Sequence, residues 1–239
     1  MKQIIKTILI AIHSFFNKNQ HGKIIYYHDV FDKVQYTDMG TSLELFMSHI
    51  SVIKKNGFKI VNRLPIYDSE IHLCFDDGWL GLWDTKDFFI NNNIFPTVFI
   101  APGLVGKHGY LNWEQILFLK EKGFNFQSHT YNHVVLTDVD DCVLVKELVD
   151  SRAIISAHLN SEIDSICYPC GNYSQKVIDE STKAGYSKIY ISVPGSYDPN
   201  ENIICRNLVQ DSSTFRLKCI LFGGLDVIKN RTKRHHFSC

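Results

Sequence analysis

Two adjacent carboxylates, Asp76 and Asp77, stand at the end of an apolar run that spans residues 71–75. A short apolar run of this kind is typical of a buried strand, which would bring both carboxylates to its carboxyl end. Gly78 follows them, and Asp-Asp-Gly taken alone is also typical of an ordinary turn. A second cluster of polar side chains favours the alternative, in which the carboxylates belong to a metal site.

This second cluster consists of His129 and His133, which come after an apolar stretch at residues 124–127. Their separation of four positions predicts that both imidazoles lie on one side of a helical turn. One carboxylate and two imidazoles, with a further position open for water, form the ligand set of a catalytic zinc ion. The other carboxylate is then free to act as a base.

The motifs resemble, in type and order, those of the polysaccharide deacetylases, the family with the NodB homology domain that is also called carbohydrate esterase family 4. Residues 74–78 are similar to its Thr-Phe-Asp-Asp-Gly motif, and residues 129–133 match its His-Ser/Thr-x-x-His motif. Residues 168–173 resemble the third motif, which lines the active-site groove in the family. The resemblance covers most of residues 24–209.

The resemblance implies a role for each of these side chains. Asp77, His129 and His133 would hold zinc, or another divalent transition metal such as cobalt, and Asp76 would take the proton from the attacking water. Zinc lowers the pKa of a bound water to about 7 and polarises a carbonyl group. The backbone N–H of Cys170 would stabilise the oxyanion. The residues expected along the groove are Tyr168, Pro169, Cys170 and Tyr173. We expect Trp113 to pack at a helix start, with stacking on a sugar ring in the groove as the alternative.

One departure from the family pattern concerns the partner of the catalytic aspartate. Many members carry an arginine two residues before the proline of the third motif, where it orients that aspartate. Cys167 stands at this position here. Arg206, at the end of the last expected strand, is the candidate to replace the missing arginine.

A second departure concerns the general acid. The family's late Leu-x-His motif is missing, because no histidine follows Asn207 until His235 and His236. The circularly permuted branch, that of the poly-N-acetylglucosamine deacetylases, carries this histidine on the first strand, and Tyr26-Tyr27-His28-Asp29 is similar to that arrangement. Histidine suits proton donation to a leaving amine near neutral pH. We therefore expect His28 to be the general acid, the alternative being a plain surface turn formed with Asp29.

Strands and helices alternate along the chain, which predicts a parallel sheet with crossover connections. The candidate site residues recur at the carboxyl ends of strands, and this favours an α/β barrel. The family resemblance implies a distorted (β/α) barrel with about seven parallel strands. The strands are expected at residues 23–27, 58–61, 71–75, 97–100, 124–127, 165–168, 188–192 and 203–207, and the helices at residues 42–56, 81–92, 113–122, 138–159 and 174–184.

The two ends of the chain differ from the expected catalytic domain at residues 21–226. Residues 1–20 contain a helical pattern with a broad apolar stripe beside lysines, too short for the about 20 residues that span a bilayer. No small-residue cleavage site follows it. We expect an interfacial membrane anchor, with packing on the domain and a degenerate signal peptide as alternatives. The basic tail at residues 227–239 is either solvated or helps to hold an anionic membrane surface.

Composition limits the possible functions. The chain of 239 residues has 45% hydrophobic residues, which suits one catalytic domain with a sizeable core. Its formal net charge of zero gives no support to a nucleic-acid partner. Seven cysteines without framework spacing favour a reducing compartment, with Cys167 and Cys170 as two thiols. We expect a cytoplasmic protein, peripheral on the inner membrane if the anchor is real, or an exported one that keeps its N-terminal segment.

These patterns together predict a metal-dependent hydrolase that removes N-acetyl groups from an amino sugar. The resemblance implies a bacterial surface polysaccharide, or its lipid-linked precursor, as the substrate. One alternative is an O-acetyl esterase or another amidase on the same fold. The other is a catalytically silent glycan-binding module, which the altered third motif would suit.

Overall fold

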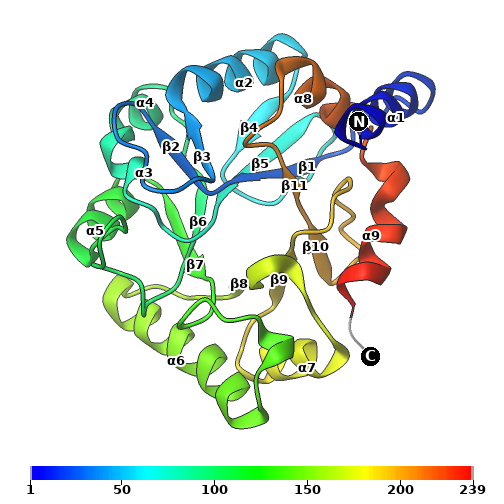
Figure 1. The fold of residues 1–239 in the computed structure, drawn as a ribbon. Helices are drawn as coiled ribbons and strands as arrows, with labels where there is room; N and C mark the ends of the chain where they lie inside the picture. The colour runs from blue at the N-terminus through cyan, green and yellow to red at the C-terminus, as the bar shows by residue number, and fades with distance from the viewer. Residues whose placement is uncertain (1, 238–239) are drawn as a thin grey trace.

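The structure is a computed structural model that describes the backbone of residues 2–237 and the side chains of residues 7–237. Parallel strands surround a common axis and helices cover them from outside (Figure 1). The strands around the axis are β1 (Lys23–Tyr27), β5 (Glu70–Phe75), β6 (Thr97–Ile100), β7 (Asn125–Ser128), β8 (Ser165–Cys167), β9 (Lys188–Ile191), β10 (Ile203–Cys205) and β11 (Asn207–Leu208).

The barrel closes through the last two strands. β10 pairs in parallel with β9, β11 pairs in parallel with β1, and only Arg206 separates β10 from β11 in the chain. The backbone N–H of Arg206 donates to the carbonyl oxygen of Val193 at 2.9 Å, so the interruption is itself held to the wall. Residues 203–208 therefore act as a seventh strand, and the prediction of a distorted barrel with about seven parallel strands is confirmed.

Three short strands lie outside this circuit. β4 (Lys59–Val61) pairs with the first half of β5, whereas β2 (Asp29–Phe31) and β3 (Gly40–Ser42) form a separate parallel pair. β1 and β5 are buried along their whole length, because one face meets the barrel interior and the other meets the helices. The barrel interior holds an apolar cluster that includes Tyr26, Cys74, Phe99, Cys167 and Tyr190.

The helices form the outer layer of the domain. They are α1 (Lys2–Phe16), α2 (Leu43–Lys55), α3 (Gly81–Asp84), α4 (Lys86–Asn91), α5 (Trp113–Glu121), α6 (Asp141–Leu159), α7 (Gln175–Lys183), α8 (Thr214–Leu221) and α9 (Lys229–His236). Side-chain caps fix several of their starts, since Ser42, Asp140 and Ser174 each accept a hydrogen bond from a backbone N–H of the first turn. Within the described residues, no helix is both long enough and apolar enough to cross a membrane.

Two segments differ from the sequence-based expectations. The single helix expected at residues 81–92 is broken at Thr85, where ψ is 7°, into α3 and α4. The basic segment at 229–236 is a helix rather than a solvated run. Lys229 and Lys233 form ion pairs with Glu201, and the carbonyl oxygen of His236 accepts the backbone N–H of Tyr173 at 3.0 Å.

Candidate metal centre and active site

Asp76 and Asp77 directly follow β5, as the sequence predicted. The chain reverses there, because Asp77 and Gly78 both have left-handed φ values, 70° and 76°. A Cβ atom at Gly78 would lie 2.8 Å from the side chain of Ile100. Position 78 therefore requires glycine both for its left-handed φ and for this close contact. The reversal sends the adjacent carboxylates to different partners.

The predicted helical turn for His129 and His133 is wrong. The segment after β7 is irregular, and Thr130 and His133 have positive φ values of 64° and 60°. The buried carboxylate of Glu147 on α6 holds this loop, since its Oε2 accepts the backbone N–H groups of Tyr131 and Asn132 at 2.8 Å each. The loop still brings the two imidazoles together, with ring centroids 4.8 Å apart.

The three predicted ligands meet at one point. The Oδ1 atom of Asp77 lies 3.1 Å from Nε2 of His133 and 3.4 Å from Nε2 of His129. This oxygen is buried and receives no hydrogen bond, whereas Oδ2 accepts one from the indole N–H of Trp79 at 3.0 Å. The Nδ1–H of His129 donates to the carbonyl oxygen of Cys167 at 2.7 Å, which leaves the Nε2 lone pair free to bind a metal. A carboxylate and two imidazoles of this kind fit a divalent transition metal.

Electrostatics keep Asp77 in the charged form that a ligand needs. Burial alone would raise the pKa of Asp77, but the close approach and the charge of His129 and His133 hold this pKa well below its usual range. The pKa of His133 is raised by the same contact, against the effect of burial. The three side chains therefore already interact strongly with one another.

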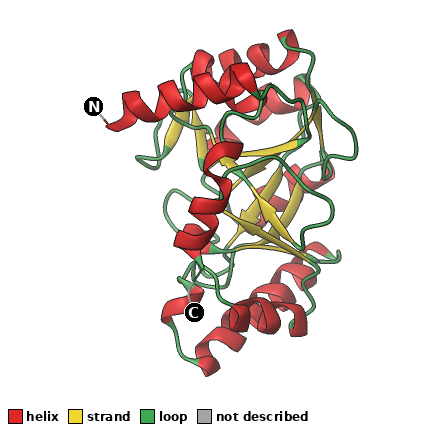
Figure 2. Ribbon diagram, turned by 90° about the vertical axis from the view of Figure 1, so that its right-hand side faces the viewer, coloured by secondary structure: helices red, strands yellow, loops and turns green. Residues whose placement is uncertain are grey.

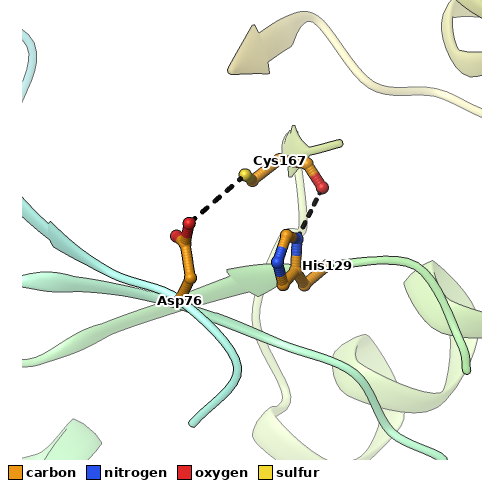
Figure 3. Close-up of side chains that lie close together, drawn as sticks. All are labelled: Asp76, His129 and Cys167. Carbon is orange, nitrogen blue, oxygen red and sulfur yellow. Dashed lines mark hydrogen bonds between the residues drawn. The ribbon is translucent and has the colours of Figure 1, made fainter. Parts of the chain in front are cut away.

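A second group of donors, Asp76, His129 and Cys167, also lies close together (Figure 3). It fits a metal less well. Burial raises the pKa of the Cys167 thiol well above its usual range, so the sulfur stays protonated, and metals bind the thiolate. Asp76 is already engaged elsewhere in the site.

Arg206 occupies both oxygens of Asp76. Its Nη1 donates to Oδ1 at 2.6 Å and its Nη2 to Oδ2 at 2.8 Å, and both side chains are almost completely buried. Burial would raise the pKa of Asp76, but the charge and hydrogen bonds of Arg206 lower it below its usual range. Nη2 also lies 2.8 Å from the sulfur of Cys167. The guanidinium of Arg206 thus contacts both Asp76 and Cys167, the residue at the position where the family carries its arginine.

His28 lies at the carboxyl end of β1 and is half-buried. Its Nδ1 atom is 2.7 Å from the carbonyl oxygen of the buried Gln210 side chain, and its charge contributes to the lowered pKa of Asp76. Asp29 turns away, since its buried carboxylate accepts the N–H of Val30 at 2.9 Å. The arrangement is not a surface turn. Nothing in the sequence marked Gln210 as a contact of His28, because 182 positions separate them.

Several side chains expected along the groove lie elsewhere. Tyr168 is buried in the core, where its hydroxyl donates to Ser181 at 2.7 Å, and Tyr173 is buried beside Phe237. Trp113 stacks on His158 with ring centroids 3.9 Å apart, so it packs between α5 and α6. The groove positions expected for Tyr168 and Tyr173 are corrected, because both rings pack in the core beside adjacent helices. For Trp113 the structure shows packing at a helix start and not a position along the groove.

Of the two other groove candidates in the third motif, only Cys170 is exposed. Pro169 is buried, whereas Cys170 is exposed and has a left-handed φ of 59°. The next residue, Gly171, approaches Ser192 so closely that a Cβ would lie 2.7 Å from it. Close packing of Gly171 therefore fixes the backbone at Cys170.

Two aromatic residues near the three predicted metal ligands were not singled out from the sequence. Trp79, which holds Asp77, stacks on Tyr110 with ring centroids 4.2 Å apart, and both rings are half-buried. Their open faces could stack on a sugar ring. The sequence did contain a signal for Trp79, because an aromatic residue two positions after Asp77 has to lie near that carboxylate.

Comparisons with known proteins agree with this geometry. The family model described as "Polysaccharide deacetylase" matches residues 66–189, which is more than half of the chain. A Bacillus subtilis protein named as the polysaccharide deacetylase YxkH is 22% identical over 204 residues, which cover 79% of this chain and 71% of that protein.

Solved structures share the fold at low sequence identity. The deacetylase PplD of Streptococcus pyogenes has a TM-score of 0.72 at 20% identity, covering 83% of this chain and 97% of its own. IcaB of Ammonifex degensii has a TM-score of 0.76 at 18% identity, covering 85% of this chain and 98% of its own. A de-N-acetylase of Aggregatibacter actinomycetemcomitans has a TM-score of 0.69 at 16% identity, covering 81% and 96% respectively.

Proposed function

Because the chain belongs to the polysaccharide deacetylase family, we propose that it is a metal-dependent hydrolase that removes N-acetyl groups from an amino sugar. The proposed substrate is a bacterial surface polysaccharide or its lipid-linked precursor. The observation that carries the proposal is the division of labour between adjacent carboxylates: Asp77 faces two imidazoles, whereas Asp76 is held apart by Arg206. Metal-dependent deacetylation needs one carboxylate that binds the metal ion and a second one that accepts the proton of the attacking water.

Asp77, His129 and His133 are the residues that would hold the metal ion. A bound divalent ion, for which we propose zinc or cobalt, supplies Lewis acidity that makes water more acidic and polarises the acetyl carbonyl. Trp79 fixes the orientation of Asp77, and the carbonyl oxygen of Cys167 fixes that of His129. These contacts hold the ligand atoms in place before any metal arrives.

Asp76 serves as the general base in this mechanism. Its lowered pKa keeps it ionised at neutral pH, so it can accept a proton from the water that attacks the carbonyl carbon. Arg206 fixes the plane of the carboxylate through two hydrogen bonds. The backbone N–H of Cys170, on the exposed end of the third motif, is the proposed donor to the oxyanion.

His28 completes the reaction as the general acid. Its Nδ1–H donates to the carbonyl oxygen of Gln210, which directs Nε2 to the leaving group. When the carbon–nitrogen bond breaks, the proton on Nε2 passes to the amine nitrogen. The products are acetate and a free amino sugar, and the proton taken up by Asp76 balances the one given by His28.

We also propose that the enzyme works in a reducing compartment, on the cytoplasmic side of the inner membrane. All six cysteines in the described part of the chain are free, and Cys167 and Cys205 are buried within it. Separate labelling of thiols in intact cells and in lysates tests this placement. Labelling of Cys142 and Cys170 by a membrane-impermeant reagent in intact cells would contradict it.

The proposed reaction is tested with short N-acetylglucosamine oligomers and with O-acetylated sugars, measuring acetate and free amine for each. The proposal predicts equal amounts of acetate and amine from the N-acetyl substrates. Acetate release confined to O-acetyl substrates would instead show an esterase. Binding of the oligomers without any acetate would show a silent module, an outcome that the ion pair between Arg206 and Asp76 argues against.

A further inference from the structure

Helix α1 is attached to the domain along one of its sides only. Ile10 is 1% exposed, and Nδ1 of His13 lies 3.1 Å from the carbonyl oxygen of Gly223, just beyond α8. Arg216 on α8 donates to Thr7 at 3.3 Å. Figure 2 shows α1 lying along the edge of the molecule, with its N-terminal end projecting past the neighbouring elements. The expected packing on the domain is therefore present, but it uses only part of the apolar stripe.

The other side of α1 leaves large apolar side chains in solvent. Phe15 is 78% exposed, Phe16 is 75% exposed, and Phe215 on the first turn of α8 is 59% exposed. A groove of about 710 Å³ separates the two helices, and all three rings line it. We call this surface the docking face. Its exposed apolar side chains are Ile8, Leu9, Ile12, Phe15, Phe16 and Phe215.

The groove of the docking face between α1 and α8 is lined by two lysines and by no carboxylate. Residues 1–18 and 212–225, which contain the two helices, include no Asp or Glu. They do include the basic residues Lys2, Lys6, Lys18, Arg216 and Lys218. Lys18 and Lys218 line the groove itself, and the ammonium of Lys18 lies 4.5 Å from the ring centroid of Phe222. A groove of apolar side chains that is lined by lysines complements an anionic lipid surface. A second copy of the chain would place like charges opposite one another.

The docking face adjoins the candidate active site. A second groove, of about 500 Å³, runs between α1 and the segment after β11. Its lining includes Thr7, Ile8 and Gln210, together with the opposite charges of Asp211 and Arg216. Gln210 also contacts His28. We propose that α1 and α8 together dock on an anionic phospholipid bilayer, which places the entrance of the site beside the membrane. Docking of this kind does not require that the enzyme be a deacetylase.

Sedimentation with lipid vesicles tests the proposal on the full chain. One set of vesicles consists of phosphatidylcholine, and the other contains phosphatidylglycerol in addition. We expect the wild-type protein to sediment with the anionic vesicles only. The double variant Phe15→Ser/Phe16→Ser should bind at least about tenfold less, because two apolar rings no longer enter the lipid. Lys18→Glu/Lys218→Glu should also lose binding.

Matched variants separate docking from general effects on folding. Ile66→Ser/Tyr67→Ser removes two side chains that are 68% and 69% exposed elsewhere on the surface, and it should bind vesicles like the wild type. Lys54→Glu/Lys55→Glu reverses two charges on α2 and should retain binding. Circular dichroism and melting temperature should be unchanged in all four variants.

Two results would overturn the proposal. One is equal sedimentation of the wild type and of Phe15→Ser/Phe16→Ser with anionic vesicles. The other is a wild-type dimer in light scattering that this variant converts to a monomer, with no vesicle binding by either protein. That result would show that a second copy covers the docking face.

Discussion

Arg206 and Asp76 are 130 positions apart in the chain, yet they form a two-point ion pair with N–O distances of 2.6 and 2.8 Å inside the barrel. Arg206 stands at the junction that closes the barrel, between β10 and β11. The residue that closes the wall therefore also orients the proposed base. Its guanidinium lies 4.1 Å from the ring centroid of Tyr26, which fills the space around the pair.

Removal of Arg206 should impair both stability and catalysis. In Arg206→Met the buried Asp76 carboxylate loses its partner, and we expect unfolding to become easier by about 3 to 5 kcal/mol. Burial then raises the pKa of Asp76, so the base is protonated up to a higher pH, and the acidic limb of the pH–rate profile should move upward. Arg206→Lys keeps the charge and should show a smaller displacement. An acidic limb that stays in place in both variants would contradict the assigned role of the pair.

The contact between His28 and Gln210 should be visible in the pH–rate profile. We expect His28→Ala to lose the basic limb and about 10²- to 10⁴-fold in kcat, because the leaving amine has no positioned proton donor. Gln210→Ala should lower kcat by about tenfold or less, with little change in KM, since it removes one hydrogen bond. Gln210→Glu should move the basic limb to higher pH because a carboxylate stabilises the imidazolium.

The exposed Gln175 offers a control for these variants, because Gln175→Ala should leave the profile unchanged. If Gln210→Glu and Gln210→Ala gave identical basic limbs, Gln210 would have only a structural role.

Asp29 should make the protein less stable as the pH rises. Burial raises the pKa of this carboxyl to about 7. Between an unfolded value near 4 and this folded value, the folded state holds the proton more tightly, so stability falls with increasing pH across this window and then levels off. The loss is at most about 4 kcal/mol. In Asp29→Asn the free energy of unfolding should vary less between about pH 4 and pH 7, the window set by these two values.

Urea titrations at several pH values give this comparison directly. Asp87→Asn on α4 removes an exposed carboxylate and should keep the wild-type slope. An equal slope in Asp29→Asn and the wild type would show that Asp29 is ionised in the folded protein.

The role of Cys170 is predicted to lie in its backbone. Cys170→Gly should retain activity, because glycine keeps the N–H group and accepts the φ of 59°. Cys170→Pro removes the N–H group and cannot adopt this φ, and it should lose about 10²- to 10³-fold in kcat. Alkylation should inactivate the wild type but not Cys170→Gly, whereas Cys142→Ala should stay sensitive, since both thiols are exposed. A folded Cys170→Pro protein with the wild-type rate would exclude this oxyanion donor.

The barrel, and the meeting of Asp77, His129 and His133 at one point, could be predicted because they depend on local patterns. The apolar runs marked most strands, and the polar residues at their carboxyl ends necessarily lie on one face of a parallel barrel. The loop that carries His133 could not be predicted, because its path depends on Glu147, an acid on the helix that follows. The same limit applied to Gln210, whose contact with His28 exists only after residues 203–208 have closed the wall.

The sequence also could not predict which side chains of the third motif are buried. A tyrosine suits either a groove, through its polar hydroxyl, or a core, through its apolar ring. The segment that contains Tyr168 and Tyr173 is short and irregular, so it has no hydrophobic periodicity that would distinguish buried from exposed positions. Packing against α7 and α9 decides the matter, since Tyr168 bonds to Ser181 and Tyr173 packs on Phe237.

The central claim is that the two adjacent acids have separate roles, Asp77 in holding a metal and Asp76 in taking a proton. The most direct test measures bound zinc and amine release on the same samples of the wild type, Asp76→Asn and Asp77→Asn, after chelation and reconstitution with zinc. We predict that chelation abolishes wild-type activity and zinc restores it. Asp76→Asn should bind zinc fully without releasing amine, and Asp77→Asn should fail to retain zinc. Full activity of the metal-free wild type, or loss of zinc from Asp76→Asn with retention in Asp77→Asn, would contradict the claim.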